Sequence, residues 1–553
     1  MAGIMKERTH PLYLIFQWHM HQPFYKDALS GAYLLPWTRC HITKDYTDMA
    51  WHLERYPEIK SVVNFVPSLL LQIRDYADLD SVNERHLTLT KKDAGNLTPE
   101  EQTFLLEEFF SANYKRIISL SPRYKELYKK RQQYTLHDGF DSALKHYTTQ
   151  EYRDLQVWFL LAWTGQEIAS HPEINSLIRQ DQEFTEEDKT RVLEVHQEYI
   201  RDVIDRYKTL AESGQIELSI SPYAHPILPL VIDSEVARIC MPGLHLPQHR
   251  FRHPDEAERH VVRGLEIARN EFGWDISGMW PSEGSVSEET ATLLAGQSLR
   301  WITSDSNVLA RSLSRTGKPA HMNSGEQYYP YRLETPEGNL DIFFRDQMLS
   351  DLIGFQYANM EPADAAENFM QHLREMYTNL PDDDFPYVAV ITMDGENAWE
   401  HFQENGKPFF DELYSAIGES DWLETTTFSE YLDKYGSPES LEWLHPGSWI
   451  TADFHIWIGD REKNAAWDAL NEALKRVKEY RRQGQDIPED VLQALLQAEG
   501  SDWFWWYGDH NQSDHEDVFD LLFCNALRKV YQGLDEQLPP SLEQYRTLVE
   551  SLG

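Results

Sequence analysis

The chain has 553 residues, of which 41% are hydrophobic, and a formal net charge of −40. This length allows about two to four folded domains. A surface this acidic repels phosphate backbones, so we expect no nucleic-acid partner. No apolar run approaches the roughly 20 residues of a membrane helix, and the apolar run at 12–16 is too short for a signal peptide. We therefore expect no membrane association, and these features leave the oligomeric state open.

Three cysteines lie far apart in the sequence. Cys40, Cys240 and Cys524 form neither a CxxC pair nor a disulfide framework. This pattern is typical of a reducing compartment, so we expect a cytoplasmic location. Aromatic residues are 12% of the chain and include 17 tryptophans. Flat rings stack on the apolar faces of sugars while neighbouring carboxylates bind the hydroxyls, so a neutral sugar ligand fits this composition.

The first predicted strand, at residues 13–18, runs directly into a histidine-rich segment. His19 and His21 are followed by Gln22 and Pro23. In an extended continuation of the strand, both histidines point to the same side. They could bind a metal or hydrogen-bond substrate hydroxyls, or they could be a structural pair.

The next elements alternate between helices and strands. We predict a helix at 37–56, a strand at 61–66, a helical insertion at about 97–147 that could act as a lid, and a buried helix at 155–163. Another helix starts after Thr185, with Asp188 as its capping-box partner, and runs to about residue 213. A strand at 216–220 then leads to a proline-stiffened loop that carries His225.

A carboxylate follows the next predicted strand. Residues 276–280 end in Trp280, and Glu283 comes three residues later. Glu288 and Glu289 compete with Glu283 for a catalytic role. They fall at a helix start, where acidic residues commonly offset the helix dipole.

Further strands are predicted at 301–303, 340–344 and 385–394. With the earlier ones they make seven candidate strands, several of them separated by helices, which favours a parallel α/β barrel. We expect this catalytic barrel to span residues 1–404, with the insertion at 97–147. A mainly helical domain is expected at 405–553, where Trp467, Leu470, Leu474 and Val477 mark one amphipathic helix face.

The last predicted barrel strand ends in a cluster of acids. Asp394 stands at the tip of the strand, and Glu396, Trp399 and Glu400 follow it. From the residues alone, Asp394 ranks only slightly ahead of Glu396 as a catalytic acid. Two aromatic clusters follow, at 449–457 and 503–510, and the second could be either an interdomain seam or part of a site.

The strand ends therefore present His19, His21, His225, Glu283 and Asp394. In a parallel barrel these ends converge on one rim. Two carboxylates there suit glycoside cleavage, because one can stay ionised while the other holds a proton for the leaving oxygen. If the carboxyl groups lie about 5–5.5 Å apart, the reaction retains the anomeric configuration.

Five motifs in this order resemble those of family 57 of the glycoside hydrolases. They are His19–Pro23, Pro222–Ile227, Trp280–Glu283, Met393–Asn397 and Ala498–Trp506. That family contains α-amylases, amylopullulanases, 4-α-glucanotransferases and α-glucan branching enzymes. The HQP segment and the DWFWW run are closer to the amylase and amylopullulanase branch than to the branching enzymes.

The resemblance implies an incomplete seven-stranded (β/α) barrel, followed by a helical domain that completes the active site. It implies that Glu283 is the nucleophile and Asp394 the general acid/base of an enzyme acting on α-glucans such as starch, glycogen and maltodextrins. It further implies a set of substrate-binding residues and no cofactor or metal. The set is His19, His21, Gln22, His225, Trp280, Trp399, Trp505 and Asp509.

Two other readings stay open on the residues. A metal-dependent deacetylase or mannosidase would use His19, His21 and His225 as ligands. A glucan-binding protein without catalytic activity would keep the pocket but would not need both Glu283 and Asp394. The sequence also does not separate hydrolysis from glucan transfer, because that choice depends on whether water or a sugar hydroxyl reaches the glycosyl-enzyme.

Overall fold

The computed structural model describes residues 8–317, 325–396, 398–508, 510–540 and 542. Its centre is a sheet of seven parallel strands in the order β7-β5-β4-β3-β2-β1-β8. These strands are β1 (Leu12–Met20), β2 (Ser61–Phe65), β3 (Ile216–Ile220), β4 (Gly278–Met279), β5 (Trp301–Asp305), β7 (Gly338–Arg345) and β8 (Val388–Asp394). Each of the seven predicted strands is present, and the predicted fold class is confirmed.

The barrel is incomplete between β7 and β8. No ladder joins these two strands in the described part of the chain. They are linked instead by single hydrogen bonds, such as that from the Asp346 backbone N–H to the Val390 carbonyl at 2.7 Å. The Arg345 guanidinium adds another, to the Thr392 carbonyl at 3.1 Å.

The barrel interior changes from apolar to polar along its axis. Near the amino ends of the strands, Tyr13 and Trp301 pack with Phe428 of helix α20 (Phe428–Tyr435), which closes that end. One layer higher, Gln17 Oε1 accepts hydrogen bonds from Thr303 at 2.9 Å and Thr392 at 3.0 Å. Buried polar groups are usually hydrogen-bonded, and these bonds fix the orientation of Gln17, Thr303 and Thr392 directly below the carboxyl ends of the strands.

The predicted helices around the barrel are present. Residues 37–55 form one continuous helical stretch from α1 (Trp37–His41) through a π-turn to α2 (Thr47–Arg55). Helix α11 (Glu186–Glu212) starts with the predicted capping box, in which Thr185 Oγ1 accepts from the Asp188 N–H at 3.2 Å. Helix α14 (Pro254–Phe272) ends at Gly273, whose φ of 94° favours glycine.

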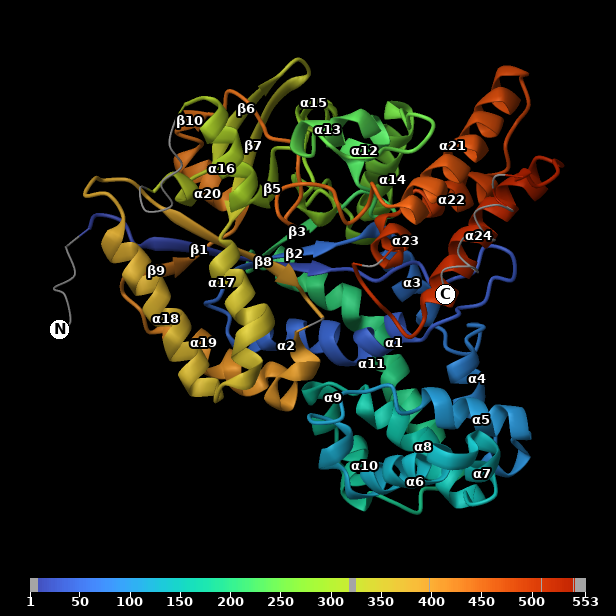
Figure 1. The fold of residues 1–553 in the computed structure, drawn as a ribbon. Coiled ribbons are helices and arrows are strands. Elements are labelled where there is room, and N and C mark those ends of the chain that lie inside the picture. Colours follow the sequence, from blue (N-terminus) through green and yellow to red (C-terminus); the bar gives the residue numbers. More distant parts are fainter. Residues whose placement is uncertain (1–7, 318–324, 397, 509, 541, 543–553) are drawn as a thin grey trace.

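The helical insertion is longer than predicted. It includes α4 (Arg85–Lys91), α5 (Pro99–Glu108), α6 (Pro122–Asp138), α7 (Phe140–Leu144), α8 (Thr149–Ala162), α9 (Gln166–Ser170) and α10 (Pro172–Gln180). Figure 1 shows these helices grouped beside the barrel, below α1 and α11. Sequence patterns located the aromatic centre of this group but not its edges, because short amphipathic helices look alike in isolation.

The C-terminal part contributes both to the sheet and to a helical bundle. After residue 405, β9 (Leu423–Thr425) pairs with β1, and β10 (Glu439–Ser440) pairs with β6 (Tyr331–Thr335), which is antiparallel to β7. These three strands were not predicted. The division at residue 405 stays a prediction, and the added strands favour a later boundary, near Arg461.

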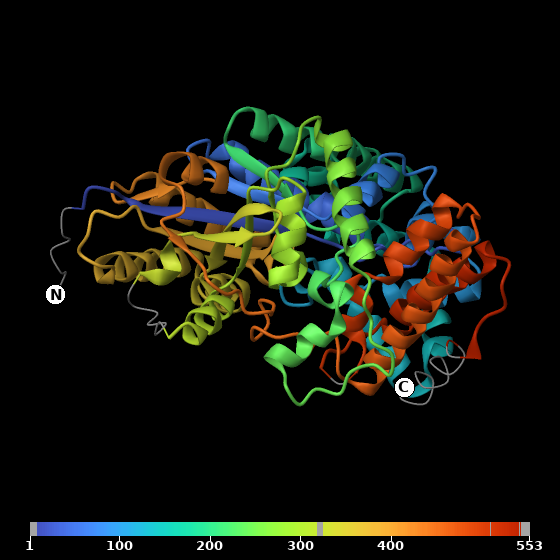
Figure 2. The same ribbon diagram turned by 90° about the horizontal axis from the view of Figure 1, so that it is seen from above.

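Four helices form the bundle that follows. They are α21 (Arg461–Arg482), α22 (Glu489–Ala498), α23 (Ser501–Trp506) and α24 (Glu516–Gly533). Figures 1 and 2 show the bundle at the end of the molecule toward which β1 runs. The predicted apolar face of α21 is buried, and Trp467 stacks on Phe504 with ring centres 4.4 Å apart. Among the described residues, each helix is too short or too polar to traverse a lipid bilayer.

Candidate active site

A cavity of about 910 Å³ lies at the carboxyl ends of the barrel strands. Its walls come from the barrel, from residues 107–131 of the helical insertion, and from α23 and α24. Six predicted site residues line it. They are His19, His21, Gln22, Glu283, Asp394 and Trp505. The barrel rim, the insertion and the helical bundle therefore enclose one common site.

Glu283 occupies a strained position in the loop after β4. Its backbone is left-handed, with φ 59° and ψ 24°. This conformation costs an L-residue roughly 1–2 kcal/mol, and such strain is concentrated at functional sites. The Trp449 Nε1–H donates to Glu283 Oε2 at 2.7 Å, and the Trp449 backbone N–H donates to the Glu283 carbonyl at 2.9 Å. Trp449 thereby fixes both the backbone and the carboxylate.

Asp394 is the last residue of β8 and stands level with His19 of β1. The next residue must be glycine, because a Cβ on Gly395 would lie 2.1 Å from the sulfur of Met20. The Gly395 N–H instead donates to the His19 carbonyl at 2.8 Å. Glycine at this position therefore lets Asp394 enter the cavity at the tip of the strand.

The two carboxyl groups act electrostatically on one another. Burial, followed by the negative charge of Asp394, raises the pKa of Glu283 to about 8. The same charge contributes to raising the pKa of His21. Burial and the neighbouring negative charge both disfavour the ionised form of Glu283, so this carboxyl group binds a proton more readily than an exposed one does. The hydrogen bond from Trp449 acts in the opposite sense and favours the ionised form.

Three histidine rings form a stack beside the acids. The ring centres of His21 and His225 are 4.0 Å apart, and those of His19 and His225 are 5.0 Å apart. His19 Nδ1 hydrogen-bonds to Asn64 Oδ1 at 2.7 Å, and burial together with His21 lowers the pKa of His19 to about 3. His19 is therefore neutral. Its Nδ1 carries the proton, because the partner oxygen can only accept, and its Nε2 is left as an acceptor.

His21 and His225 are held by the helical bundle. His21 Nε2 lies 2.7 Å from Asp502 Oδ1, and His225 Nδ1 lies 3.0 Å from Ser501 Oγ. Burial opposes a charge on His21, but Asp502 outweighs it and raises the pKa. His225, with φ 57°, is a second non-glycine residue in the left-handed region. Both residues therefore depend on α23 for their orientation.

One group of side chains in the site could hold a metal ion. Donor atoms of His21, His225 and Asp502 all lie within 4.8 Å of one another. This set differs from the predicted alternative, in which His19 was the third ligand, because His19 Nδ1 is turned to Asn64. His21 and Asp502 already satisfy each other at 2.7 Å. The expectation that the site works without a metal stays a prediction.

Two predicted sugar-binding tryptophans lie behind the cavity wall. Trp280 is fully buried and Trp399 is 1% exposed, and neither is among the lining residues described for the cavity. The Trp399 Nε1–H donates to the Gly395 carbonyl at 2.8 Å, and Trp280 packs edge-on against Trp449. In the free protein they support the turn after Asp394 and the partner of Glu283. Their direct contact with sugar stays a prediction, and Asp509 lies outside the described residues.

The acids that follow Asp394 take different places. Glu396 is 2% exposed and accepts hydrogen bonds from Gln22 Nε2 and from the His21 backbone N–H, both at 3.2 Å. Burial and the charge of Asp394 raise its pKa well above the usual value. Glu400 lies at the cavity rim beside His401. Glu396 thus anchors the segment that carries His21 and Gln22.

Sequence reasoning missed several lining residues. Trp449 and Asp502 fell within segments that had been singled out, but neither had a role. Trp37 and Trp163 also line the cavity, with ring centres 5.4 Å apart. The sequence carried no signal for this pair, because the two residues come from different helices and meet only in the folded chain.

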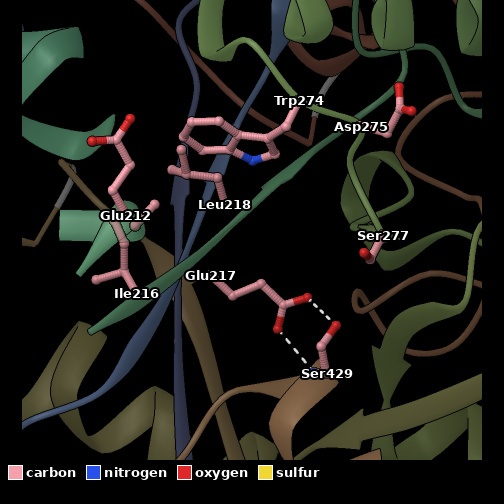
Figure 3. A pocket seen from close by; sticks show the side chains of 9 residues that line it. Glu212, Ile216, Glu217, Leu218, Trp274, Asp275, Ser277 and Ser429 are labelled. Atoms are coloured by element: carbon pink, nitrogen blue, oxygen red, sulfur yellow. Dashed lines mark hydrogen bonds between the residues drawn. The ribbon is translucent and has the colours of Figure 1, made fainter. Parts of the chain in front are cut away.

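A second hollow, of about 320 Å³, lies at the opposite end of the barrel (Figure 3). Trp274 and Leu218 form its apolar wall, and Glu217 points to Ser429. The Glu217 carboxylate accepts from the Ser429 N–H at 2.9 Å, from Ser429 Oγ at 2.6 Å and from Trp301 Nε1 at 2.8 Å. A carboxylate bound in this way ties α20 to the sheet and is not available for chemistry.

Known proteins resemble the chain in sequence and in fold. An α-amylase from Pyrococcus horikoshii is 25% identical over 258 residues, which is 45% of this chain and 33% of that protein. A 4-α-glucanotransferase from Thermococcus litoralis is 23% identical over 266 residues, which is 47% of this chain and 33% of that protein. The chain thus matches only about a third of the length of these curated relatives.

A solved structure extends the similarity over nearly the whole chain. The family 57 branching enzyme from Pyrococcus horikoshii matches with a TM-score of 0.58 and 15% identity, over 97% of this chain and 94% of that one. At this identity the likeness concerns the fold. The family model for glycosyl hydrolase family 57 matches residues 15–442, and these include most of β1, all of β2 to β10, and both Glu283 and Asp394. The chain therefore belongs to glycosyl hydrolase family 57.

Proposed function

We propose that this protein cleaves α-1,4 bonds of α-glucans by a retaining double displacement, with Glu283 as nucleophile and Asp394 as general acid/base. One observation carries the proposal. Two carboxyl groups from different barrel strands enter the same cavity, and the charge of one contributes to the shifted pKa of the other. The names of the relatives, α-amylase and 4-α-glucanotransferase, support α-glucans as the substrate class.

In the first step, Glu283 attacks the anomeric carbon while Asp394 gives its proton to the departing glycosidic oxygen. A bond forms between Glu283 and the sugar, and the bond to the leaving chain breaks. The Trp449 Nε1–H, 2.7 Å from Glu283 Oε2, holds the carboxylate in position and favours its ionised form. His19 lines the cavity, and its unprotonated Nε2 can accept a hydrogen bond from a sugar hydroxyl.

In the second step, Asp394 acts as base and removes a proton from the incoming acceptor. That acceptor then attacks the anomeric carbon and releases Glu283. Water as acceptor completes hydrolysis, whereas a sugar hydroxyl completes transfer. Aromatic walls such as Trp37 and Trp163 can retain an acceptor sugar in the cavity and exclude water. This feature supports 4-α-glucanotransferase activity as the second candidate on the same site.

Product analysis tests the reaction. Purified protein is incubated with maltoheptaose, and the products are separated by length and linkage. Shorter sugars alone indicate hydrolysis, longer α-1,4 chains indicate transfer, and α-1,6 branch points indicate branching. The absence of any product from maltoheptaose, glycogen and starch would contradict the proposal.

Trapping the intermediate tests the role of Glu283. A fluorinated α-maltosyl fluoride slows the second step, so a glycosyl-enzyme should accumulate and be visible by mass spectrometry. Peptide mapping should place the added mass on Glu283, and Glu283→Gln should remain unlabelled. Labelling of another residue would overturn the assignment.

The cellular location of the enzyme and the class of its binding partners are also proposals. No disulfide joins the three cysteines, all of which lie in the described part of the chain, and Cys40 and Cys524 are buried. Cysteines without disulfides suit a reducing compartment, which supports a cytoplasmic location. The formal charge of −40 supports neutral glucans rather than nucleic acid as partners.

A further inference from the structure

A buried group of ionisable side chains joins the barrel to the helical bundle behind the histidine stack. Glu256 and His260 come from α14, and Glu499 comes from the end of α22. All three are fully buried. His260 Nε2 and Glu499 Oε2 are 2.8 Å apart, so one hydrogen bond connects the two parts of the molecule.

His260 also contacts the loop that carries His225. The Ala224 N–H points to His260 Nδ1 at 3.4 Å, and the Tyr223 N–H donates to the His260 carbonyl at 3.0 Å. Because Nδ1 faces a donor, the ring proton lies on Nε2 and is donated to Glu499. Burial lowers the pKa of His260 to about 3, so the ring is neutral.

The other end of the connection is the start of α23. Gly500 follows Glu499, and a Cβ there would lie 2.7 Å from the Ala224 carbonyl. The next residue, Ser501, donates its N–H to the His225 carbonyl at 3.0 Å and holds His225 Nδ1 through its hydroxyl. Asp502 then holds His21. Glu499 is thus directly followed by the residues that orient two histidines of the site.

We propose that His260 and Glu499 are positioning residues, which lock α23 against the His225 loop so that Ser501 and Asp502 orient His225 and His21. The pair touches no substrate and acts only through these neighbours. The expected loss of activity in variants of this pair rests on the proposed function, whereas the expected change in backbone protection does not.

The pKa shifts in this group favour the uncharged forms of His260 and Glu499. Burial raises the pKa of Glu499 to about 8, and burial followed by the charge of Glu499 raises that of Glu256 to about 7. Arg259 Nη1 lies 2.8 Å from Glu256 Oε2. The charged groups that face the pair are Arg259 and Asp255 on α14 and Lys478 and Arg481 on α21. Near neutral pH both acids therefore bind a proton more readily than an exposed carboxylate does.

Hydrogen–deuterium exchange tests the lock without substrate. Glu499→Leu and His260→Leu should each raise exchange in residues 221–227 and 499–506. Glu499→Gln and His260→Gln keep a hydrogen-bonding group at each place and should restore protection. The matched control is His196→Leu in α11, because His196 is also buried, neutral and bound by a single side-chain hydrogen bond, to Thr164 at 2.9 Å.

Kinetics on maltoheptaose supply the second readout. Each leucine variant should lower kcat/KM by about 10- to 100-fold, the scale expected when a site is misplaced by about 1 Å. His196→Leu should leave kcat/KM within about twofold of wild type, since neither His196 nor its partner Thr164 lines the cavity. If one leucine variant fails to fold, the other carries the same test.

The outcomes separate the two proposals. Exchange that rises in both segments supports the lock even if the wild-type protein acts on no glucan, which would overturn only the proposed function. An active wild type whose leucine variants match the His196→Leu control in both exchange and kcat/KM would overturn the lock.

Discussion

Two glutamates at opposite ends of the same barrel accept a hydrogen bond from a tryptophan indole, yet their settings differ. Glu217, at the start of β3, also accepts two bonds from Ser429. Glu283, after β4, accepts one side-chain bond, from Trp449, and lines the same cavity as Asp394. The first carboxylate is saturated with donors, whereas the second keeps acceptor capacity for a ligand.

The backbone conformations of the two glutamates also differ. Glu217 lies in regular β-strand, but Glu283 is held left-handed at φ 59°. Burial raises the pKa of both carboxyl groups, but only for Glu283 is another acid, Asp394, the next cause. The comparison teaches that a buried acid beside a tryptophan is not by itself a catalytic signal. Unsatisfied acceptor capacity, backbone strain and a second acid together distinguish the site.

The largest effect should come from Glu283→Gln. Loss of the proposed nucleophile should lower kcat on maltoheptaose by at least about 10³-fold, because the proposed glycosyl-enzyme could not form. Circular dichroism should show an unchanged fold. A variant that retains most of its activity would remove Glu283 from the mechanism and break the contrast with Glu217.

Asp394→Asn should have the next largest effect. Loss of general acid/base catalysis should lower kcat by about 10²- to 10⁴-fold on maltoheptaose. The loss should be smaller on α-maltosyl fluoride, because fluoride leaves without protonation, and added azide should restore turnover by replacing the activated water. Equal losses on both substrates would argue against an acid role.

Trp449→Phe tests the single hydrogen bond that holds Glu283. Removing the indole N–H should cost about 1–2 kcal/mol of transition-state stabilisation, or roughly 5- to 30-fold in kcat. KM should change less, because the bond acts on the nucleophile and not on the bound chain. A change confined to KM would instead make Trp449 a sugar-binding residue.

Glu217→Gln applies the matched substitution to the other glutamate. An amide cannot accept from all three donors, so the variant should lose about 1–3 kcal/mol of unfolding free energy, measured by urea denaturation. Its kcat/KM should equal that of wild type. A large loss of activity without loss of stability would assign a function to the amino-terminal hollow.

The last prediction concerns a pH-dependent difference in stability between wild type and Glu283→Gln. The folded pKa of Glu283, about 8, lies above the unfolded value near 4.5. Its stabilising contribution is therefore present below about pH 4.5 and is lost as pH rises through about 8. The Tm of Glu283→Gln minus the Tm of wild type should therefore increase from pH 5 to pH 8. A constant difference would show that the pKa is not raised.

Part of the fold and of the site could be predicted from the sequence. The seven parallel strands were found, because buried strands such as β1 and β8 are continuous apolar runs of β-branched and aromatic residues. The short β9 and β10 were not found, since two or three residues show no periodicity. Residues just beyond predicted strand ends, such as His19 and Glu283, were placed at the correct rim because parallel strands share one carboxyl end.

The sequence by itself determined where the seven strands lie along the chain, the caps of helices such as α11, and which acids stand at strand tips. These features depend on local periodicity and on neighbouring residues. Only the tertiary structure decided that Trp449 holds Glu283, that Trp399 supports a turn behind the wall, and that Glu499 meets His260. Two of these contacts join residues that are far apart in sequence, and the third depends on how the chain turns after Asp394. Their geometry is set by how the barrel, the insertion and the bundle pack together, which no single segment encodes.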